Sequence, residues 1–251
     1  MTGPAATAPS TRVPLPGVRA LLAAAVVVAV VNLAAQVLDA AWVGRVSIWL
    51  FMPLLGLWAW TATPRPVPRP LALLLVGTVF AWGGDVFLSL PRDGDLLFLL
   101  GIGSFLVMQV LYLLAFRSVP GPGLVRAWPI AWIPYGVFWV GMNALLWPGT
   151  GDLRIPVLVY SAALVLMAVA ALDLVLRVPR ADGWRVAWGA VLFVVSDACI
   201  ALRAFVDVLP DGRVTSVLIM VTYLPAQLLI VTGFVRAVRA VSRPTGSAAT
   251  P

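Results

Sequence analysis

The chain has 251 residues, of which 62% are hydrophobic and only 11% are charged, and its mean hydropathy is +1.02. A water-soluble domain of this length cannot bury so much apolar surface, so the composition predicts that lipid is the solvent. All 17 basic residues are Arg, all 10 acidic residues are Asp, and His is absent, which excludes His-ligated zinc or haem, a Ser-His-Asp triad and a retinal Schiff base on Lys. The net charge of +7 is spread over short gaps between apolar runs, so nucleic acid is not an expected partner.

The N-terminal segment 1–16 is rich in Pro, Ala and Thr and is expected to be a disordered cytoplasmic tail. Eight apolar runs follow, and each has about 20 residues, the length that crosses a bilayer core of roughly 30 Å. They predict an all-α, polytopic membrane bundle of about eight transmembrane helices over 17–238, followed by a disordered cytoplasmic tail at 239–251. The first run lacks a convincing cleavage site, so we expect a span and no cleaved signal peptide. The expected spans are 17–38, 42–62, 71–90, 96–116, 126–147, 154–176, 185–204 and 214–237.

The distribution of Arg predicts the orientation of the bundle, because cytoplasmic segments of membrane proteins carry the excess of basic residues. Alternate tails and loops carry twelve Arg on one side and five on the other. The richer side is predicted to be cytoplasmic, which makes the chain a multi-pass protein of the cell membrane with both termini inside. The twelve are Arg12, Arg19, Arg65, Arg69, Arg117, Arg126, Arg177, Arg180, Arg185, Arg236, Arg239 and Arg243, and the five are Arg45, Arg92, Arg154, Arg203 and Arg213.

Two aspartates lie well inside predicted spans. Asp85 is about 14 residues and Asp197 about 12 residues from the start of its span, which is roughly 21 Å and 18 Å of helical rise. Both spans run outward, so both carboxyls are expected at similar depth in the outer half of the membrane. A charged Asp at a helix centre costs on the order of 2.5–3.5 kcal/mol, which favours a shared polar cavity with at least one carboxyl protonated. The alternative is a buried pair that ties two helices together by hydrogen bonds.

Other polar residues inside the spans have two interpretations, a role in a functional site and a role in helix packing. Gln109 and Tyr112 lie on one face of the fourth span, and Tyr223 and Gln227 form a similar stripe in the last; for each, packing between helices is the alternative. Gly84-Asp85 is echoed by Ser196-Asp197 and Gln109-x6-Phe116 by Gln227-x6-Phe234, which suggests two parallel four-helix halves.

Three further polar features predict structure rather than chemistry. Asp173 precedes Arg177 by four residues, so an ion pair at a helix end is expected. Arg203 and Asp207 have the same spacing and the same interpretation. The single Cys199 lies in an apolar run and is expected to pack in the core.

Six short segments lie in a recognisable order over roughly residues 20–240. They are Met52-Pro53-Leu54, Gly84-Asp85-Val86-Phe87-Leu88, Gly101-x-x-Ser104-Phe105-Leu106-Val107-Met108-Gln109-Val110-Leu111-Tyr112, Pro156-Val157-Leu158-Val159-Tyr160, Gly189-Ala190-x-x-Phe193-x-x-Ser196-Asp197 and Thr222-Tyr223-x-x-Ala226-Gln227-Leu228-Leu229. In this order and spacing the chain resembles the YhhN family of multi-span membrane proteins, which includes the lysoplasmalogenases.

The resemblance implies cleavage of the vinyl-ether bond of a lysoplasmalogen, which gives a fatty aldehyde and a glycerophospho-ethanolamine or -choline without any cofactor or metal. Enol-ether hydrolysis begins with protonation of carbon by a general acid and passes through an oxocarbenium ion that water attacks. A protonated Asp can donate that proton, and an ionised Asp can stabilise the cation and activate water. Asp85 and Asp197 are therefore the predicted catalytic pair, without assigned roles. The predicted substrate-binding residues, for a lysophospholipid in the membrane, are Tyr112, Tyr160, Tyr223, Gln227, Gln109 and Ser196.

The chain departs from the family pattern at two places. Family members commonly carry His where this chain has Gln109 and Lys where it has Met52 before Pro53; Gln cannot shuttle a proton and Met cannot hold a phosphate. A rival hypothesis is a lipid or small-molecule transporter that uses the Asp pair to bind a proton or cation, and the parallel halves favour it. A third is a structural membrane protein in which the pair clamps two helices.

Overall fold

The computed structural model describes residues 16–91, 96–206, 208–209 and 212–242. Within these ranges the chain is helical and has no strand, and eight helical segments are long and apolar enough to cross a membrane. In chain order the elements are α1 (Pro16–Val37), α2 (Ala41–Ala62), α3 (Arg69–Ser89), α4 (Leu96–Arg117), α5 (Leu124–Ala127), η1 (Pro129–Trp132), α6 (Ile133–Leu146), η2 (Gly151–Leu153), α7 (Arg154–Asp173), η3 (Leu174–Leu176), α8 (Arg180–Phe205) and α9 (Arg213–Val241). The all-α membrane bundle is therefore confirmed.

The helix boundaries follow the predicted spans closely, with three differences. The α8 helix begins at Arg180, five residues before the predicted span, and α9 continues to Val241, a little beyond residue 238. Residues 1–15 and 243–251 of the predicted tails lie outside the described residues. The span expected at 126–147 is divided into α5, η1 and α6. The α-helix is interrupted at Trp128, because a residue before proline is pushed out of the helical region; Trp128 precedes Pro129 and has φ −134° and ψ 80°.

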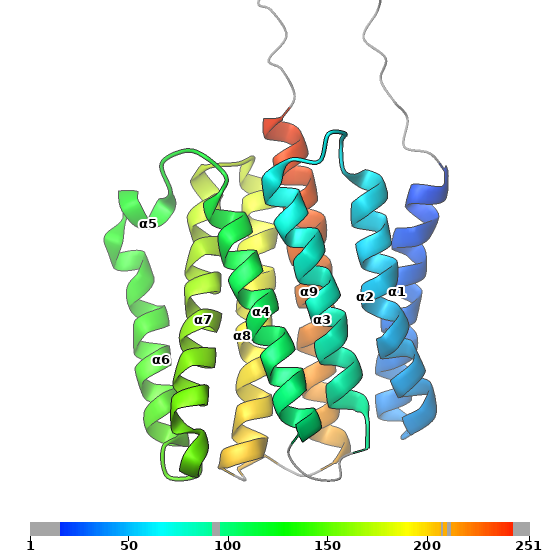
Figure 1. Ribbon diagram of the computed structural model, residues 1–251, viewed down its shortest axis with the longest axis vertical. Coiled ribbons are helices and arrows are strands. Elements are labelled where there is room, and N and C mark those ends of the chain that lie inside the picture. The colour runs from blue at the N-terminus through cyan, green and yellow to red at the C-terminus, as the bar shows by residue number, and fades with distance from the viewer. Residues whose placement is uncertain (1–15, 92–95, 207, 210–211, 243–251) are drawn as a thin grey trace, which may run out of the picture.

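The helices run up and down and stand side by side, with the described ends of α1 and α9 at the same end of the bundle (Figure 1). Sequence neighbours pack as pairs, α1 with α2, α3 with α4 and α8 with α9. Across the bundle α4 packs on α7, and α9 packs on α1, α2 and α3. The contacts α4–α7 and α9–α2 correspond to one another if α1–α4 and α6–α9 are equivalent halves, which is the repeat that the sequence suggests.

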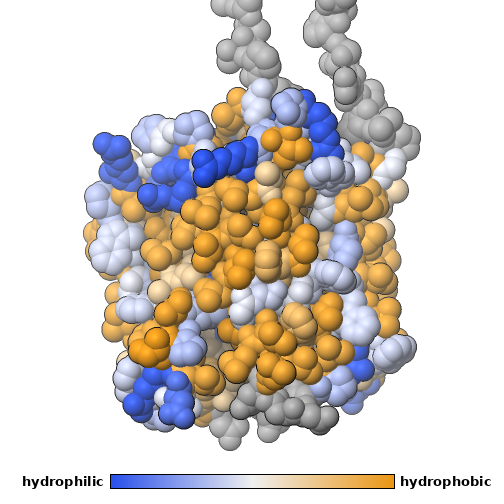
Figure 2. Space-filling model, viewed as in Figure 1, coloured by the Kyte–Doolittle hydropathy of each residue, from blue (hydrophilic) through white to orange (hydrophobic). Residues whose placement is uncertain are grey.

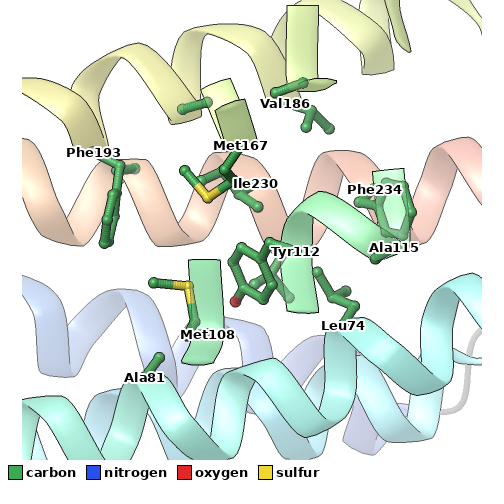
Figure 3. Close-up of a cluster of buried hydrophobic side chains, with 14 of the residues drawn as sticks. Leu74, Ala81, Met108, Tyr112, Ala115, Met167, Val186, Phe193, Ile230 and Phe234 are labelled. Atoms are coloured by element: carbon green, nitrogen blue, oxygen red, sulfur yellow. The ribbon is translucent and has the colours of Figure 1, made fainter. Parts of the chain in front are cut away.

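Figure 3 shows the apolar core in the middle of the bundle. Met108 and Tyr112 from α4 meet Met167 from α7, Phe193 from α8 and Ile230 from α9, and all five side chains are completely buried. Aromatic rings continue this layer toward the end that carries the termini, where Phe116 and Phe234 lie edge to face with their ring centroids 5.1 Å apart. The helices are thus held apart at fixed distances by large side chains, which is how a packed interior sets geometry.

The outer surface matches a lipid environment. On the face that Figure 2 shows, apolar residues cover most of the middle of the bundle, and hydrophilic residues gather at both ends. Tryptophans stand at the margins of this apolar region: Arg65 lies 3.8 Å above the ring of Trp60, and Arg154 lies 4.9 Å above the ring of Trp147. Such Arg–Trp pairs suit the membrane–water interface, where an aromatic ring has one apolar and one wet side.

Candidate functional site

A cavity of about 520 Å³ lies at the end of the bundle opposite the termini, between the ends of α1, α2, α3, α8 and α9. Both intramembrane aspartates line it, Asp85 from α3 and Asp197 from α8, and each residue is more than nine-tenths buried. The shared cavity that their depth predicted is therefore present. Its polar lining residues are Gln36, Asp39, Arg45, Asp85, Ser89, Ser196, Asp197, Arg203, Arg213, Ser216 and Tyr223.

Glycines bring the neighbouring helices close enough to build this site. A Cβ atom on Gly84, directly before Asp85, would lie 2.5 Å from the ring of Phe105 on α4. A Cβ atom on Gly189, two turns before Asp197, would lie 2.9 Å from the carbonyl oxygen of Ala226 on α9. Small residues allow membrane helices to pack closely, and at these two positions even a Cβ atom would clash. The pairs α3–α4 and α8–α9 are therefore tight, which fixes the heights of the two carboxyls.

Two side-chain donors hold the carboxyl of Asp197. The Tyr160 hydroxyl on α7 donates a hydrogen bond of 2.7 Å to its Oδ2, and the Gln109 amide on α4 donates one of 3.2 Å to the same oxygen. Hydrogen bonds to a carboxylate are stronger than those to a neutral acid. Asp197 is therefore surrounded by donors, from α7 and α4, that stabilise the ionised form of its carboxyl.

The surroundings of Asp85 differ. Its Oδ2 atom is buried and has no hydrogen-bond partner among the described residues, and the same holds for the hydroxyl of Tyr223. The side chains of Asp85 and Tyr223 nevertheless lie close enough to interact directly. A buried carboxyl oxygen without a donor is better matched to the neutral form of the acid, which carries its own proton. The cavity thus holds one carboxyl whose Oδ2 accepts two hydrogen bonds and one whose Oδ2 accepts none from the described residues.

The remaining predicted residues divide into two groups. Ser196 lines the cavity and donates a hydrogen bond of 3.2 Å to the carbonyl oxygen of Ile219. Tyr112 and Gln227 lie deeper and do not line the cavity; the Tyr112 hydroxyl donates to Gln227 Oε1 at 3.1 Å. For Tyr112 and Gln227 this contact agrees with the alternative interpretation, in which they pack helices together, rather than with substrate binding.

Three arginines at the cavity mouth were not singled out as site residues in the sequence. Arg45 on α2, Arg203 at the end of α8 and Arg213 at the start of α9 all line the cavity. In the sequence Arg45 and Arg213 counted only toward topology, and Arg203 also as the expected partner of Asp207. Their nearness depends on helices that are far apart along the chain. A usable signal was that Arg is scarce on this side, yet Arg203 lies fewer than two turns after Asp197.

A second cavity of about 370 Å³ opens at the end that carries the termini, lined by Arg117, Arg126, Arg177 and Asp173. Here the predicted ion pair between Asp173 and Arg177 is confirmed. Asp173 also accepts the backbone N–H of Val125 at 2.8 Å, which docks α5. This carboxylate is satisfied, so the cavity lacks an available acid. The other predicted pair involves Asp207, which lies outside the described residues.

The fold and cavity define a class: polytopic helical membrane proteins with a two-carboxyl site inside the bundle. No group of His, Cys, Asp and Glu among the described residues could hold a metal ion. The YhhN family profile matches residues 44–234, which include both aspartates and most of the cavity. The chain belongs to the YhhN family.

Several relatives carry the same name. The chain is 36% identical over 148 residues to lysoplasmalogenase TMEM86B of Sus scrofa, covering 59% of this chain and 56% of the relative. It is 31% identical over 180 residues to the lysoplasmalogenase of Mycobacterium tuberculosis, covering 69% and 64%. It is 36% identical over 187 residues to lysoplasmalogenase TMEM86A of Bos taurus, covering 73% and 71%. The match thus spans less than two thirds of the first two relatives. No solved structure matches the chain.

Proposed function

We propose that the protein is a membrane-embedded lipid hydrolase that cleaves the vinyl-ether bond of a lysoplasmalogen, with Asp85 and Asp197 as its acid–base pair. The observation that carries the proposal is the unequal environment of two carboxyls in one cavity: Asp197 Oδ2 accepts two hydrogen bonds, whereas Asp85 Oδ2 is buried and accepts none from the described residues. Unequal neighbours are how paired carboxyls take different protonation states and different roles. The names of the relatives supply the substrate class.

The chemistry assigns a role to each carboxyl. Asp85, in its neutral form, gives its proton to the vinyl carbon remote from oxygen, and the adjacent carbon becomes an oxocarbenium ion. Asp197 removes a proton from water, which attacks that ion and forms a hemiacetal. As the hemiacetal collapses, Asp197 returns the proton to the departing glycerol oxygen and the hemiacetal hydroxyl returns one to Asp85. The products are the fatty aldehyde and the glycerophospho-alcohol, and both carboxyls are reset.

The neighbouring residues position the pair. Tyr160 and Gln109 hold one oxygen of Asp197 through the two hydrogen bonds described above. Tyr223 lies beside Asp85 and lines the cavity, where its buried hydroxyl orients the carboxyl of Asp85. Gln109 replaces the His of other family members, and in this scheme it needs to donate a hydrogen bond rather than carry a proton.

The packed core favours the hydrolase over the transporter. Beneath the carboxyls, Met108, Tyr112, Phe193 and Phe234 are completely buried, and they separate the site from the cavity at the other end. A transporter needs access to its binding site from both sides of the membrane. A hydrolase needs access from one side only.

We also propose that the protein lies in the cell membrane with both termini in the cytoplasm. The end of the bundle that carries the termini has the excess of arginines, and cytoplasmic ends of membrane helices carry this excess. The candidate site then opens toward the outer leaflet, where a single-chain lysophospholipid can enter it directly.

The test is aldehyde release from a panel of vinyl-ether, alkyl-ether and ester lysolipids by the purified protein, followed by mass spectrometry. Asp85→Asn and Asp197→Asn are each expected to lower turnover of the vinyl-ether lipid by at least ~100-fold, the usual contribution of a general acid or base. Asp152→Asn is the matched control, because Asp152 is exposed in η2 and lies away from the cavity. If the wild-type protein hydrolysed none of these lipids, the hydrolase proposal would be refuted.

A further inference from the structure

Three of the arginines at the outer end of the bundle gather around the cavity mouth. Arg45 is in the second turn of α2, Arg203 in the last turn of α8, and Arg213 begins α9. All three line the cavity that contains the two carboxyls. Arg154, at the same end of the bundle, does not line it. Arg154 lies 4.9 Å above the ring of Trp147, and Arg45 lies 5.8 Å above the ring of Trp42. The positive charge is therefore concentrated where the cavity opens.

The guanidinium groups of this cluster are available to a ligand. None of the ion pairs between described residues involves Arg45 or Arg203. Arg45 is oriented by its Nε, which donates to the carbonyl oxygen of Ser89 at 3.1 Å, and its terminal nitrogens are not used in this contact. Arg213 pairs with Asp39 at 3.2 Å, but both side chains are more than half exposed, and an exposed pair of this kind holds its partners only weakly.

The distance between the arginines and the carboxyls fits one class of molecule. Arg203 follows Asp197 by six residues on the same helix, which is roughly 9 Å of rise. In a lysoplasmalogen six bonds join the reacting vinyl-ether carbon to the phosphorus, an extended span on the order of 7 Å. A lipid whose phosphate lies among the arginines therefore places its vinyl-ether bond at the depth of Asp85 and Asp197.

We propose that Arg45, Arg203 and Arg213 form a subsite for the phosphate of a lysophospholipid head group, and that Asp39 meets the amine of a zwitterionic head. This subsite rests on the proposed function and names the residues that select its substrate. Guanidinium groups bind phosphate oxygens in paired hydrogen bonds, which makes Arg the preferred partner of a phosphodiester. The subsite supplies the phosphate contact that Met52 cannot make, because Met52 is completely buried in the core.

Asp39 is presented toward the head group by its backbone. It has φ 59°, a left-handed conformation that is uncommon outside glycine, in the turn between α1 and α2. Its carboxylate touches Arg213, so it lies next to the expected position of the phosphate. When the phosphate binds Arg213, it replaces Asp39 as the partner of this arginine. Asp39 can then bind the ammonium group of the head group, which is only two carbons away from the phosphodiester. A carboxylate beside three guanidinium groups is complementary to a zwitterionic head group.

The test measures binding rather than turnover, so that it stands apart from the hydrolase test. The probes are an alkyl-ether lysophosphocholine, which has no vinyl bond, the alkylglycerol that lacks its phosphocholine, and inorganic phosphate. Titration calorimetry with the full chain in nanodiscs of neutral lipid gives each dissociation constant. We expect the wild-type protein to bind the lysophosphocholine more than tenfold more tightly than the alkylglycerol or free phosphate, because a charge-assisted contact contributes on the order of tenfold in affinity.

Arg203→Gln is expected to weaken binding of the lysophosphocholine on the order of tenfold and to leave binding of the alkylglycerol unchanged. Arg154→Gln, outside the cavity, is the matched control and should change neither. Asp39→Asn is expected to reduce the preference for the phosphocholine lipid over an alkyl-ether lysophosphatidic acid. Melting temperatures identify any variant that fails to fold, and Arg45→Gln then provides a second test of the phosphate contact.

Equal affinity of the wild-type protein for lysophosphocholine and alkylglycerol would overturn the subsite. Equal affinity for lysophosphocholine and inorganic phosphate would show a simple anion site, and would overturn it as well. A protein that binds lysophosphocholine through these arginines but hydrolyses no lysolipid would instead refute the proposed function and leave the subsite standing.

Discussion

Asp85 and Asp197 are the same residue type in the same cavity, but their neighbours differ. Asp197 Oδ2 receives hydrogen bonds from Tyr160 and Gln109, whereas Asp85 Oδ2 receives none among the described residues. The proposed roles, with Asp85 as the general acid and Asp197 as the general base, depend on this difference. If the donors to Asp197 stabilise its negative charge, then removal of one of them should lower the rate of the water-activating step without unfolding the protein.

Tyr160→Phe tests that expectation. The change removes the hydroxyl that donates to Asp197 at 2.7 Å and keeps the ring. Turnover of the vinyl-ether lipid is expected to fall on the order of tenfold to a hundredfold, the effect of losing a hydrogen bond to a charged group, with little change in KM. Steady-state aldehyde release gives both values.

Tyr112→Phe is the matched control for Tyr160→Phe. It also loses a hydroxyl hydrogen bond inside the bundle, but to Gln227 rather than to Asp197, and Tyr112 does not line the cavity. We expect this variant to melt at a lower temperature and to keep its turnover. If both variants lost turnover equally, the hydroxyl of Tyr160 would have no special role.

The sequence predicts the individual helices well and their contacts poorly. Length and apolarity locate the spans because each must cross the same bilayer, and depth along two outward-running spans brings Asp85 and Asp197 to one level. Helical spacing gives the face on which Tyr112 and Gln227 lie, but it does not show that this face meets another helix rather than the cavity. That depends on which helices are neighbours, which the tight α3–α4 and α8–α9 pairs decide.

At the scale of the helix pair, Gly189 controls how closely α8 approaches α9. A Cβ atom there would lie 2.8 Å from Ile230 Cγ1 and 2.9 Å from the carbonyl oxygen of Ala226. The carbonyl belongs to the backbone, so Gly189→Ala must push the helices apart, at a cost of about 1–3 kcal/mol by analogy with overpacked cores. The expected result is a lower melting temperature in detergent, together with reduced turnover because Asp197 moves with α8.

Gly103→Ala is the matched control for the helix pair. Gly103 lies on the exposed face of α4, and a Cβ atom there would have nothing within 4 Å. This substitution exchanges the same two residue types in a membrane helix without a steric clash. Its melting temperature is expected to equal or slightly exceed that of the wild-type protein. Equal losses in the two variants would mean that glycine itself, rather than close packing, is what these helices require.

Two cavities lie at opposite ends of the described bundle: the larger contains Asp85 and Asp197, and the smaller contains only Asp173, which is paired with Arg177. The layer between them is formed by completely buried side chains such as Met108, Phe193 and Phe234. Apolarity alone places all of these residues in a membrane, but it does not show that they form a seal. The seal, together with the orientation from the Arg distribution, leads to the last prediction.

Thiol labelling in whole cells tests both orientation and one-sided access. In a Cys199→Ala background, Ile219→Cys places a thiol in the cavity lining, and we expect a membrane-impermeant maleimide to label it from the outside of intact cells. Ser242→Cys, at the end of α9, should be labelled only after the membrane is opened. Val140→Cys, exposed on the apolar face of α6, should stay unlabelled because lipid shields it. Labelling of Ile219→Cys from the cytoplasmic side in inverted vesicles would show alternating access, because the packed layer would then have to open. The transporter hypothesis would then explain the Asp pair better than the hydrolase proposal.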